Sequence, residues 1–111
     1  MKKIKLLILS TLASTSINTY AQCIEGGIKD TSNNPVIYAN VILLNASDST
    51  FFKGSVSDDQ GMFRIDGVQK GNYILKLSYL GYKEYTQRFS VLGDDMNIGF
   101  ITLNEDTKVL S

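Results

Sequence analysis

The stretch Tyr73–Tyr79, with the sequence Tyr-Ile-Leu-Lys-Leu-Ser-Tyr, decides the fold class of this chain. An aromatic or leucine residue occupies every second position, and Lys76 and Ser78 fall between them. Successive side chains of a β-strand point to opposite faces of the sheet, so this alternation predicts a strand with one buried face. Gly71 and Gly81 flank it, and we expect it to be a central strand. The side chains predicted to share its inner face are Tyr73, Leu75, Leu77 and Tyr79.

Other segments on both sides of this strand show short apolar alternation cut by turn residues, and no window has an apolar stripe at helical spacing. This pattern predicts an all-β chain of six or seven strands, folded as a small antiparallel two-sheet sandwich of the transthyretin or immunoglobulin kind. A small barrel and an open meander are the alternatives. The other predicted strands are 24–29, 39–45, 51–57, 62–68, 83–91 and 97–103.

Two details refine this prediction. The polar stretch 30–35 has Asp, Asn and Pro, which favour turns, so we expect a hairpin-like reversal after the first strand. In the strand 39–45, Ile42 and Leu44 lie on the face opposite Val41 and Leu43, so that second face is only partly polar.

The beginning of the chain has the features of a secretory signal peptide. A basic start precedes the apolar run Leu6–Leu9 and a small residue, Ala21, so residues 1–21 are the expected leader and Gln22 the mature N-terminus. The apolar run is too short for a membrane anchor, and an amphipathic surface helix is the other alternative. Cys23 would suit a lipoprotein, but such signals require a small residue where Gln22 stands.

Charge and composition exclude several classes of function. Removal of residues 1–21 takes three lysines, which leaves eight basic and eleven acidic residues and a formal net charge of −3. An acidic domain is a poor candidate for nucleic-acid binding. The chain has no His, the commonest catalytic base and a usual zinc ligand, and its single Cys rules out an internal disulfide. No catalytic residue and no cofactor is therefore expected.

Two small groups of residues are candidates for a site. Asp58 and Asp59, with the carbonyl of Gln60, offer oxygen ligands of the kind that calcium prefers. The alternative is structural, because Asp in a turn commonly hydrogen-bonds the local backbone, and it applies equally to the pair Asp94 and Asp95.

The second group is aromatic. Tyr79, Tyr82 and Tyr85 offer flat rings with one hydroxyl each, which suits sugar stacking or peptide docking, with Tyr82 and Tyr85 as the expected binding surface. The alternative is that Tyr79 and Tyr85 are core residues and that Tyr82 packs at the end of a sheet.

An ordered series of motifs runs through the whole mature chain. It reads Ile24-x-Gly26-x-Ile28-x-Asp30, Pro35, Ala39-x-Val41-x-Leu43, Asp48-Ser49, Gly54-x-x-x-Asp58-x-x-Gly61-x-Phe63, Val68-x-x-Gly71-x-Tyr73-x-Leu75 and Ser78-x-x-Gly81-Tyr82. Between residues 24 and 103 the chain resembles the carboxypeptidase regulatory-like domain, which is similar in fold to transthyretin. In particular, it is similar to the copies at the N-terminus of TonB-dependent receptors of the Bacteroidota.

The resemblance implies a domain over residues 22–104, with 105–111 as a tail or the start of a linker. It implies a non-catalytic periplasmic module of an outer-membrane receptor, serving as spacer or interaction domain. The implied partners are the plug and barrel of the same longer protein, or periplasmic proteins. Because those domains do not follow here, we expect either a fragment of a longer chain or a free-standing exported sandwich that binds carbohydrate or protein.

Overall fold

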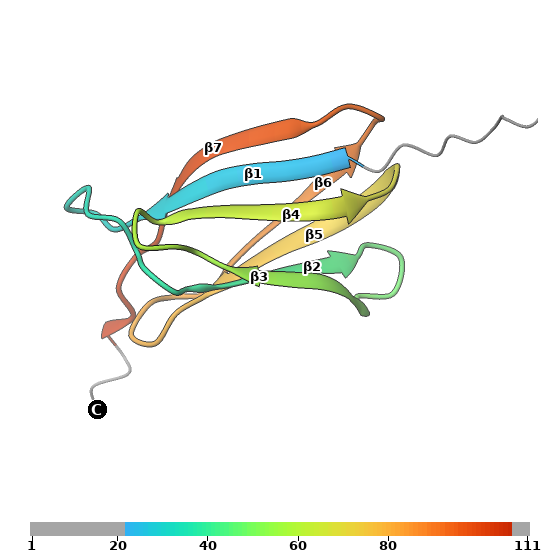
Figure 1. Ribbon diagram of the computed structural model, residues 1–111. Coiled ribbons are helices and arrows are strands. Elements are labelled where there is room, and N and C mark those ends of the chain that lie inside the picture. The colour runs from blue at the N-terminus through green and yellow to red at the C-terminus, as the bar shows by residue number, and fades with distance from the viewer. Residues whose placement is uncertain (1–21, 108–111) are drawn as a thin grey trace, which may run out of the picture.

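The computed structural model describes residues 22–107, so the expected leader 1–21 and the last four residues lie outside the described part. Its seven strands form two sheets that pack face to face (Figure 1). The three-stranded sheet has the order β4-β1-β7 and the four-stranded sheet the order β3-β2-β5-β6. The strands are β1 (Gln22–Lys29), β2 (Asn40–Asn45), β3 (Phe51–Val56), β4 (Met62–Val68), β5 (Gly71–Ser78), β6 (Tyr85–Val91) and β7 (Met96–Thr102). This confirms the predicted sandwich.

Strand β5 lies inside the four-stranded sheet, as its sequence predicted. It pairs antiparallel with β2 on one side and with β6 on the other. Three of its four predicted inner side chains, at positions 73, 75 and 77, are buried. The fourth prediction was wrong, because Tyr79 lies beyond the strand and is 39% exposed. The chain turns there, and the Tyr82 N–H donates to the Tyr79 carbonyl over 3.0 Å.

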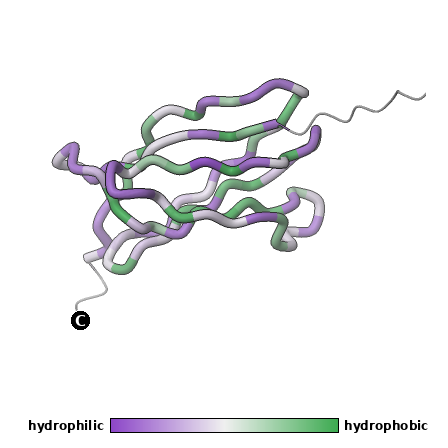
Figure 2. The backbone as a smooth tube through the Cα atoms, viewed as in Figure 1, coloured by the Kyte–Doolittle hydropathy of each residue, from purple (hydrophilic) through white to green (hydrophobic). Residues whose placement is uncertain are grey.

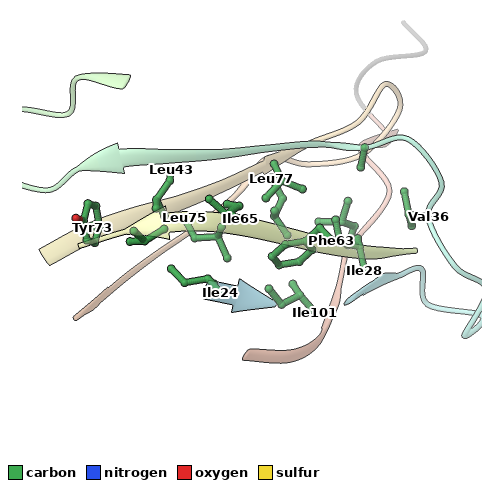
Figure 3. Packing of buried hydrophobic residues seen from close by; sticks show 14 of the residues in the cluster. Ile24, Ile28, Val36, Leu43, Phe63, Ile65, Tyr73, Leu75, Leu77 and Ile101 are labelled. Carbon is green, nitrogen blue, oxygen red and sulfur yellow. The ribbon is translucent and has the colours of Figure 1, made fainter. Parts of the chain in front are cut away.

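The core fills the space between the two sheets (Figure 3). Alternate side chains of both sheets point into it, which is the arrangement that excludes water from both inner faces. Its buried members are Ile24, Ile28, Val36, Ala39, Val41, Leu43, Phe63, Ile65, Val68, Tyr73, Leu75, Leu77, Val91, Ile101 and Leu103.

One strand pair departs from the expected antiparallel arrangement. β1 pairs antiparallel with β4 but parallel with β7. β7 follows β6 of the opposite sheet, crosses the open side of the sandwich and then runs beside β1 in the same direction (Figure 1). β1 is thus the central strand of its sheet. A Cβ on Gly26 or Gly27 would lie 2.7 or 2.5 Å from the rings of Phe63 and Phe100, so aromatic side chains cover these glycines closely.

The connection from β1 to β2 reverses the chain only locally. The Asp30 N–H donates to the Asn34 carbonyl, and Lys29 forms an isolated bridge with Pro35. The predicted reversal after the first strand is therefore confirmed, although β2 belongs to the other sheet and does not pair with β1. The Asp30 carboxylate accepts the N–H groups of Ser32 and Asn34 and so orders this loop, which Figure 2 shows as hydrophilic.

The chain remains hydrogen-bonded past β7. The Lys83 N–H donates to the Asn104 carbonyl over 2.8 Å, and the Asp106 N–H donates to the Gly81 carbonyl over 2.9 Å. The segment expected to be a solvated tail is therefore exposed at Asn104 and Glu105 but fixed to the β5–β6 turn through Asp106. Within residues 22–107 there is no helix of the length and apolarity needed to cross a membrane.

Candidate functional site

The turn between β3 and β4 is organised by the Asp58 side chain. Its Oδ1 accepts the N–H groups of Gln60 and Met62, both over 2.9 Å, and the Gly61 N–H donates to the Asp58 carbonyl. These backbone hydrogen bonds, first that of Met62 and then that of Gln60, lower the pKa of the Asp58 carboxyl below its ordinary value. The structural interpretation of this turn therefore accounts for Asp58.

The structure does not bring further acidic ligands to Asp58 and Asp59. Among residues 22–107, no group of three or more His, Cys, Asp or Glu side chains is arranged to hold a metal ion. Asp59 is exposed and follows Asp58 directly in the sequence. Calcium binding at this pair would depend on backbone carbonyls and water for most of its ligands.

The second acidic pair has a separate structural role. Asp95 Oδ1 accepts the Cys23 N–H over 2.8 Å and so joins the start of β1 to the turn before β7. Cys23 itself is buried, its Sγ lies 3.7 Å from Glu25 Oε2, and burial raises the pKa of its thiol. Within the described residues, neither Asp94 nor Asp95 belongs to a group of three or more His, Cys, Asp or Glu side chains that could hold a metal ion.

The aromatic group divides into two parts. The Tyr79 and Tyr82 rings contact each other, with centroids 5.8 Å apart and planes tilted by 44°. Tyr82 packs against the core and bridges to Glu105. Burial raises the pKa of the Tyr82 phenol, and the nearby charge of Asp30 raises it further. With Leu80 beside it, 90% exposed, this pair forms an amphipathic tip on the β5–β6 turn.

Tyr85 is not part of that tip. It begins β6, packs partly against the core, and its hydroxyl donates to Gln87 Oε1 on the same strand. No ring contact joins it to Tyr79 or Tyr82 in the described part of the chain. The structure therefore places the two residues predicted as one binding surface, Tyr82 and Tyr85, in different environments.

The structure also has an open depression that the sequence did not predict. It has a volume of about 680 Å³ and lies at the other end of the four-stranded sheet, where β5 begins and β6 ends. Lys70 and Arg88 line it, and none of its lining residues is acidic. Neither of these two cations has an ion pair among residues 22–107. The Ser90 hydroxyl donates to the Asn72 amide oxygen over 2.6 Å at its wall. Three segments far apart in sequence build it, so no local motif could indicate it.

Hydrogen bonds within the domain already engage the candidate side chains. Backbone groups occupy Asp58 and Asp95, and the tyrosines have no charged partner within hydrogen-bonding distance among the described residues. The depression offers positive charge and amide groups, which suit an anionic or hydroxyl-rich ligand.

Comparison with known proteins gives a consistent family assignment. The profile of the carboxypeptidase regulatory-like domain matches residues 23–103. The chain is also similar to the TonB-dependent receptor SusC of Bacteroides thetaiotaomicron, with 30% identity over 112 residues. That alignment covers 99% of this chain and 10% of the receptor, so the chain spans about a tenth of the length of this relative.

Solved structures share the fold at low sequence identity. The major pilin subunit BcpA of Bacillus cereus has a TM-score of 0.65 and 17% identity, over 78% of this chain and 29% of the pilin. The 5-hydroxyisourate hydrolase of Klebsiella pneumoniae has a TM-score of 0.58 and 17% identity, over 73% of this chain and 90% of the hydrolase. Catechol 1,2-dioxygenase from Pseudomonas arvilla C-1 has a TM-score of 0.61 and 10% identity, over 81% and 54%. The sandwich is thus common to structural proteins and enzymes, and it does not define a function.

Proposed function

The chain belongs to the carboxypeptidase regulatory-like domain family, and on that premise we propose that it is a non-catalytic module of a TonB-dependent receptor-like protein of the outer membrane. In this proposal the sandwich lies in the periplasm, precedes the plug and barrel of a longer chain, and serves as a spacer or interaction domain. The observation that carries it is the 30% identity to a receptor of which this chain spans about a tenth.

The geometry of residues 104–106 supports a spacer. Backbone hydrogen bonds at Asn104 and Asp106 hold the end of the domain against the β5–β6 turn. A chain that continues past Thr107 would therefore leave the sandwich from a fixed position. When the chain leaves a domain in a fixed direction, the orientation of the domain constrains the segment that follows, whereas a flexible linker would not impose this constraint.

The absence of catalysis is proposed from the chemistry of the side chains. The chain has no His, and hydrogen bonds to backbone N–H groups occupy the best candidate carboxylates, Asp58 and Asp95. Several structural relatives are enzymes, but identities of 10–18% among the solved structures relate only the fold.

Fractionation of the native organism tests the receptor proposal. An antibody against the sandwich should detect, in the outer-membrane fraction, a product several hundred residues longer than this chain. Sequencing of the locus past codon 111 should show the matching open frame. The N-terminal peptide found by mass spectrometry should begin at Gln22. A small soluble periplasmic product would overturn the proposal.

A free-standing exported domain that binds carbohydrate is the second candidate. The contact between the Tyr79 and Tyr82 rings, with Leu80 beside them, favours it because such rings can stack on a sugar. Calorimetry with neutral and acidic oligosaccharides would compare the wild type with Tyr79→Ala at the tip and Arg88→Ala in the depression. Binding that only Tyr79→Ala removes would support the tip. Negligible heats for all three proteins would reject this candidate.

A further inference from the structure

The space between the two sheets has two open sides, and side chains cover one of them more completely than the other. β3 and β4 border one side, where Lys53 of β3 lies over Gly67 of β4, with Nζ 2.9 Å from the place of a Gly67 Cβ. β6 and β7 border the other side. Within the described residues, β6 pairs only with β5, and β7 pairs only with β1. Each of these strands therefore has one edge whose N–H and C=O groups no strand pairs.

An apolar cavity opens between these two edges. Its volume is about 210 Å³, and Leu75, Gln87, Phe89, Met96 and Ile98 line it. We call these five residues the seam. Four of them are apolar, and Leu75 belongs to the buried core, so the core reaches the surface of the domain here.

The burial of β6 shows the same incomplete cover. Its inner positions pair directly with buried residues of β5, Gln87 with Leu75 and Phe89 with Tyr73. Leu75 is 1% exposed, whereas its neighbour Gln87 is exposed and Phe89 is half-buried. A polar Gln at an inward position is tolerated because no strand covers the sheet beyond β6.

We propose that the seam is a strand-addition site: an extended segment of another polypeptide pairs with the free edge of β6 and places alternate apolar side chains over the seam. The backbone of β6 supplies hydrogen bonds, and the seam supplies selectivity for apolar residues at every second position. β6 suits this role because its register with β5 is continuous from Gly71–Val91 to Leu77–Tyr85. The proposal gives the interaction role a physical site, and it does not depend on membership in a receptor.

Charge defines the occupant further. Arg88 is the middle residue of β6, it is exposed on the outer face of the sheet, and it has no ion pair within residues 22–107. Opposite charges on directly facing residues of neighbouring strands stabilise a sheet, so the added strand should have an acidic residue across from Arg88. The same position disfavours a second copy of the chain. Antiparallel pairing of two β6 strands about their centre would place the two Arg88 side chains face to face.

A peptide titration followed by NMR tests the proposal on the isotopically labelled chain, exported and purified from an expression host. The probe is the peptide Val-Thr-Leu-Asp-Val-Thr-Leu, with Asp at its centre. One control peptide has Lys in place of Asp, and a second has every backbone amide methylated, so that it cannot pair as a strand. We expect shifts in the β6 amides and in the methyl groups of Leu75, Met96 and Ile98.

The charge controls give the decisive comparison. The Lys peptide should bind the wild type about two- to fivefold more weakly than the Asp peptide, and the exposed substitution Arg88→Glu should reverse this order. The proposal would be overturned by absence of shifts at β6, by equal shifts with the methylated peptide, or by shifts centred on β3. Sedimentation that shows dimerisation through β6 would assign the seam to a second copy and would also overturn it. All these readouts use the purified chain, so they are independent of the fractionation result.

Discussion

At the scale of single residues, Ser57 has the most demanding position. It is fully buried, its hydroxyl accepts the Ala39 N–H over 2.8 Å, and it donates to the Val36 carbonyl over 2.7 Å. The Ser57 N–H also donates to the Ala39 carbonyl. One side chain thus satisfies two buried backbone groups on the segment that leads into β2.

Replacement of Ser57 by Ala should destabilise the domain by about 1–3 kcal/mol, because it leaves the Ala39 N–H and the Val36 carbonyl without partners. Urea unfolding of both proteins measures the difference. Ser55→Ala is the matched control, since the Ser55 hydroxyl makes only a long 3.5 Å contact with the Val56 carbonyl. Equal midpoints for the two variants would contradict this account of Ser57.

The Asp58 carboxylate should make stability depend on pH. Its pKa in the folded state lies below the ordinary value of 3.8, so its contribution is present above that pH and is lost as the pH falls through the lowered pKa. Asp58→Asn should therefore lower Tm at neutral pH, and the difference from the wild type should shrink as the pH of the melts falls below 3.8 and through the lowered pKa. Asp59→Asn controls for charge and should leave Tm unchanged. A Tm difference independent of pH would refute the role of the ionised form.

The residues that sequence analysis identified correctly act through local chemistry. A structural role for Asp58 in a turn was one of the two predicted alternatives, and the turn forms because the Asp carboxylate accepts nearby N–H groups. Tyr79 was misplaced because the alternation of strand β5 continues one residue beyond the point where the chain turns. Gly81, two residues later and with a φ of +92°, marks the turn but not the residue at which the strand ends.

At the scale of elements, the β1–β4 pair depends on a close contact at Gly61. This residue has φ of +77°, and its carbonyl accepts the Ile28 N–H over 2.7 Å. A Cβ at Gly61 would lie 2.6 Å from the Ile28 carbonyl oxygen and 2.9 Å from Pro35 Cβ. Both the backbone conformation and the available space therefore require glycine.

Gly61→Ala should separate β1 from the start of β4 and destabilise the fold by about 3 kcal/mol or more. Gly93→Ala is the matched control, because Gly93 also has positive φ, +119°, but nothing lies within 4 Å of its Cβ position. That variant should lose only the part that comes from backbone strain, about 1–2 kcal/mol. Thermal melts of the two variants measure the difference. Similar losses would show that the contact with the Ile28 carbonyl is unimportant.

The strands themselves were predictable from the sequence, whereas the parallel pairing of β1 with β7 was not. Alternation has a period of two, which identifies a strand and its inner face, and the predicted segments match the seven observed strands to within two residues at each end. The same period occurs in parallel and antiparallel strands, so it does not show the direction in which two strands pair. The parallel partnership of β1 and β7 joins the two ends of the domain, and only the path of the whole chain determines it.

At the scale of the molecule, the sites that were missed share one property. The seam draws on three strands and the open depression on three separate segments, so each exists only after segments distant in sequence have come together. The inward position of Gln87 was the one available signal for the seam, since a polar residue within an apolar alternation indicates incomplete burial. The partial apolarity of the outer face of β2 was predicted, and Ile42 and Leu44 are half-buried there.

The segment after β7 connects the two sheets, because its hydrogen bonds link the three-stranded sheet to the β5–β6 turn of the other sheet (Figure 1). The Leu103 N–H donates to the Lys29 carbonyl, the Asn104 carbonyl accepts the Lys83 N–H, and the Asp106 N–H donates to the Gly81 carbonyl. If each hydrogen bond contributes about 0.5–1.5 kcal/mol, we expect the stable domain to extend to Asp106, two residues past the boundary predicted at residue 104.

Two truncations test this boundary. A chain that ends at Thr107 retains all three bonds and should unfold at the same urea concentration as the longer chain. A chain that ends at Leu103 loses the bonds of Asn104 and Asp106, and it should lose about 1–3 kcal/mol of stability. Its β5–β6 turn should also exchange amide hydrogens faster, while the central strand β5 stays protected. If both truncated chains unfold at the same urea concentration, the segment 104–106 does not contribute to the stability of the sandwich. In that case, the orientation of anything that continues the chain is not fixed by the β5–β6 turn.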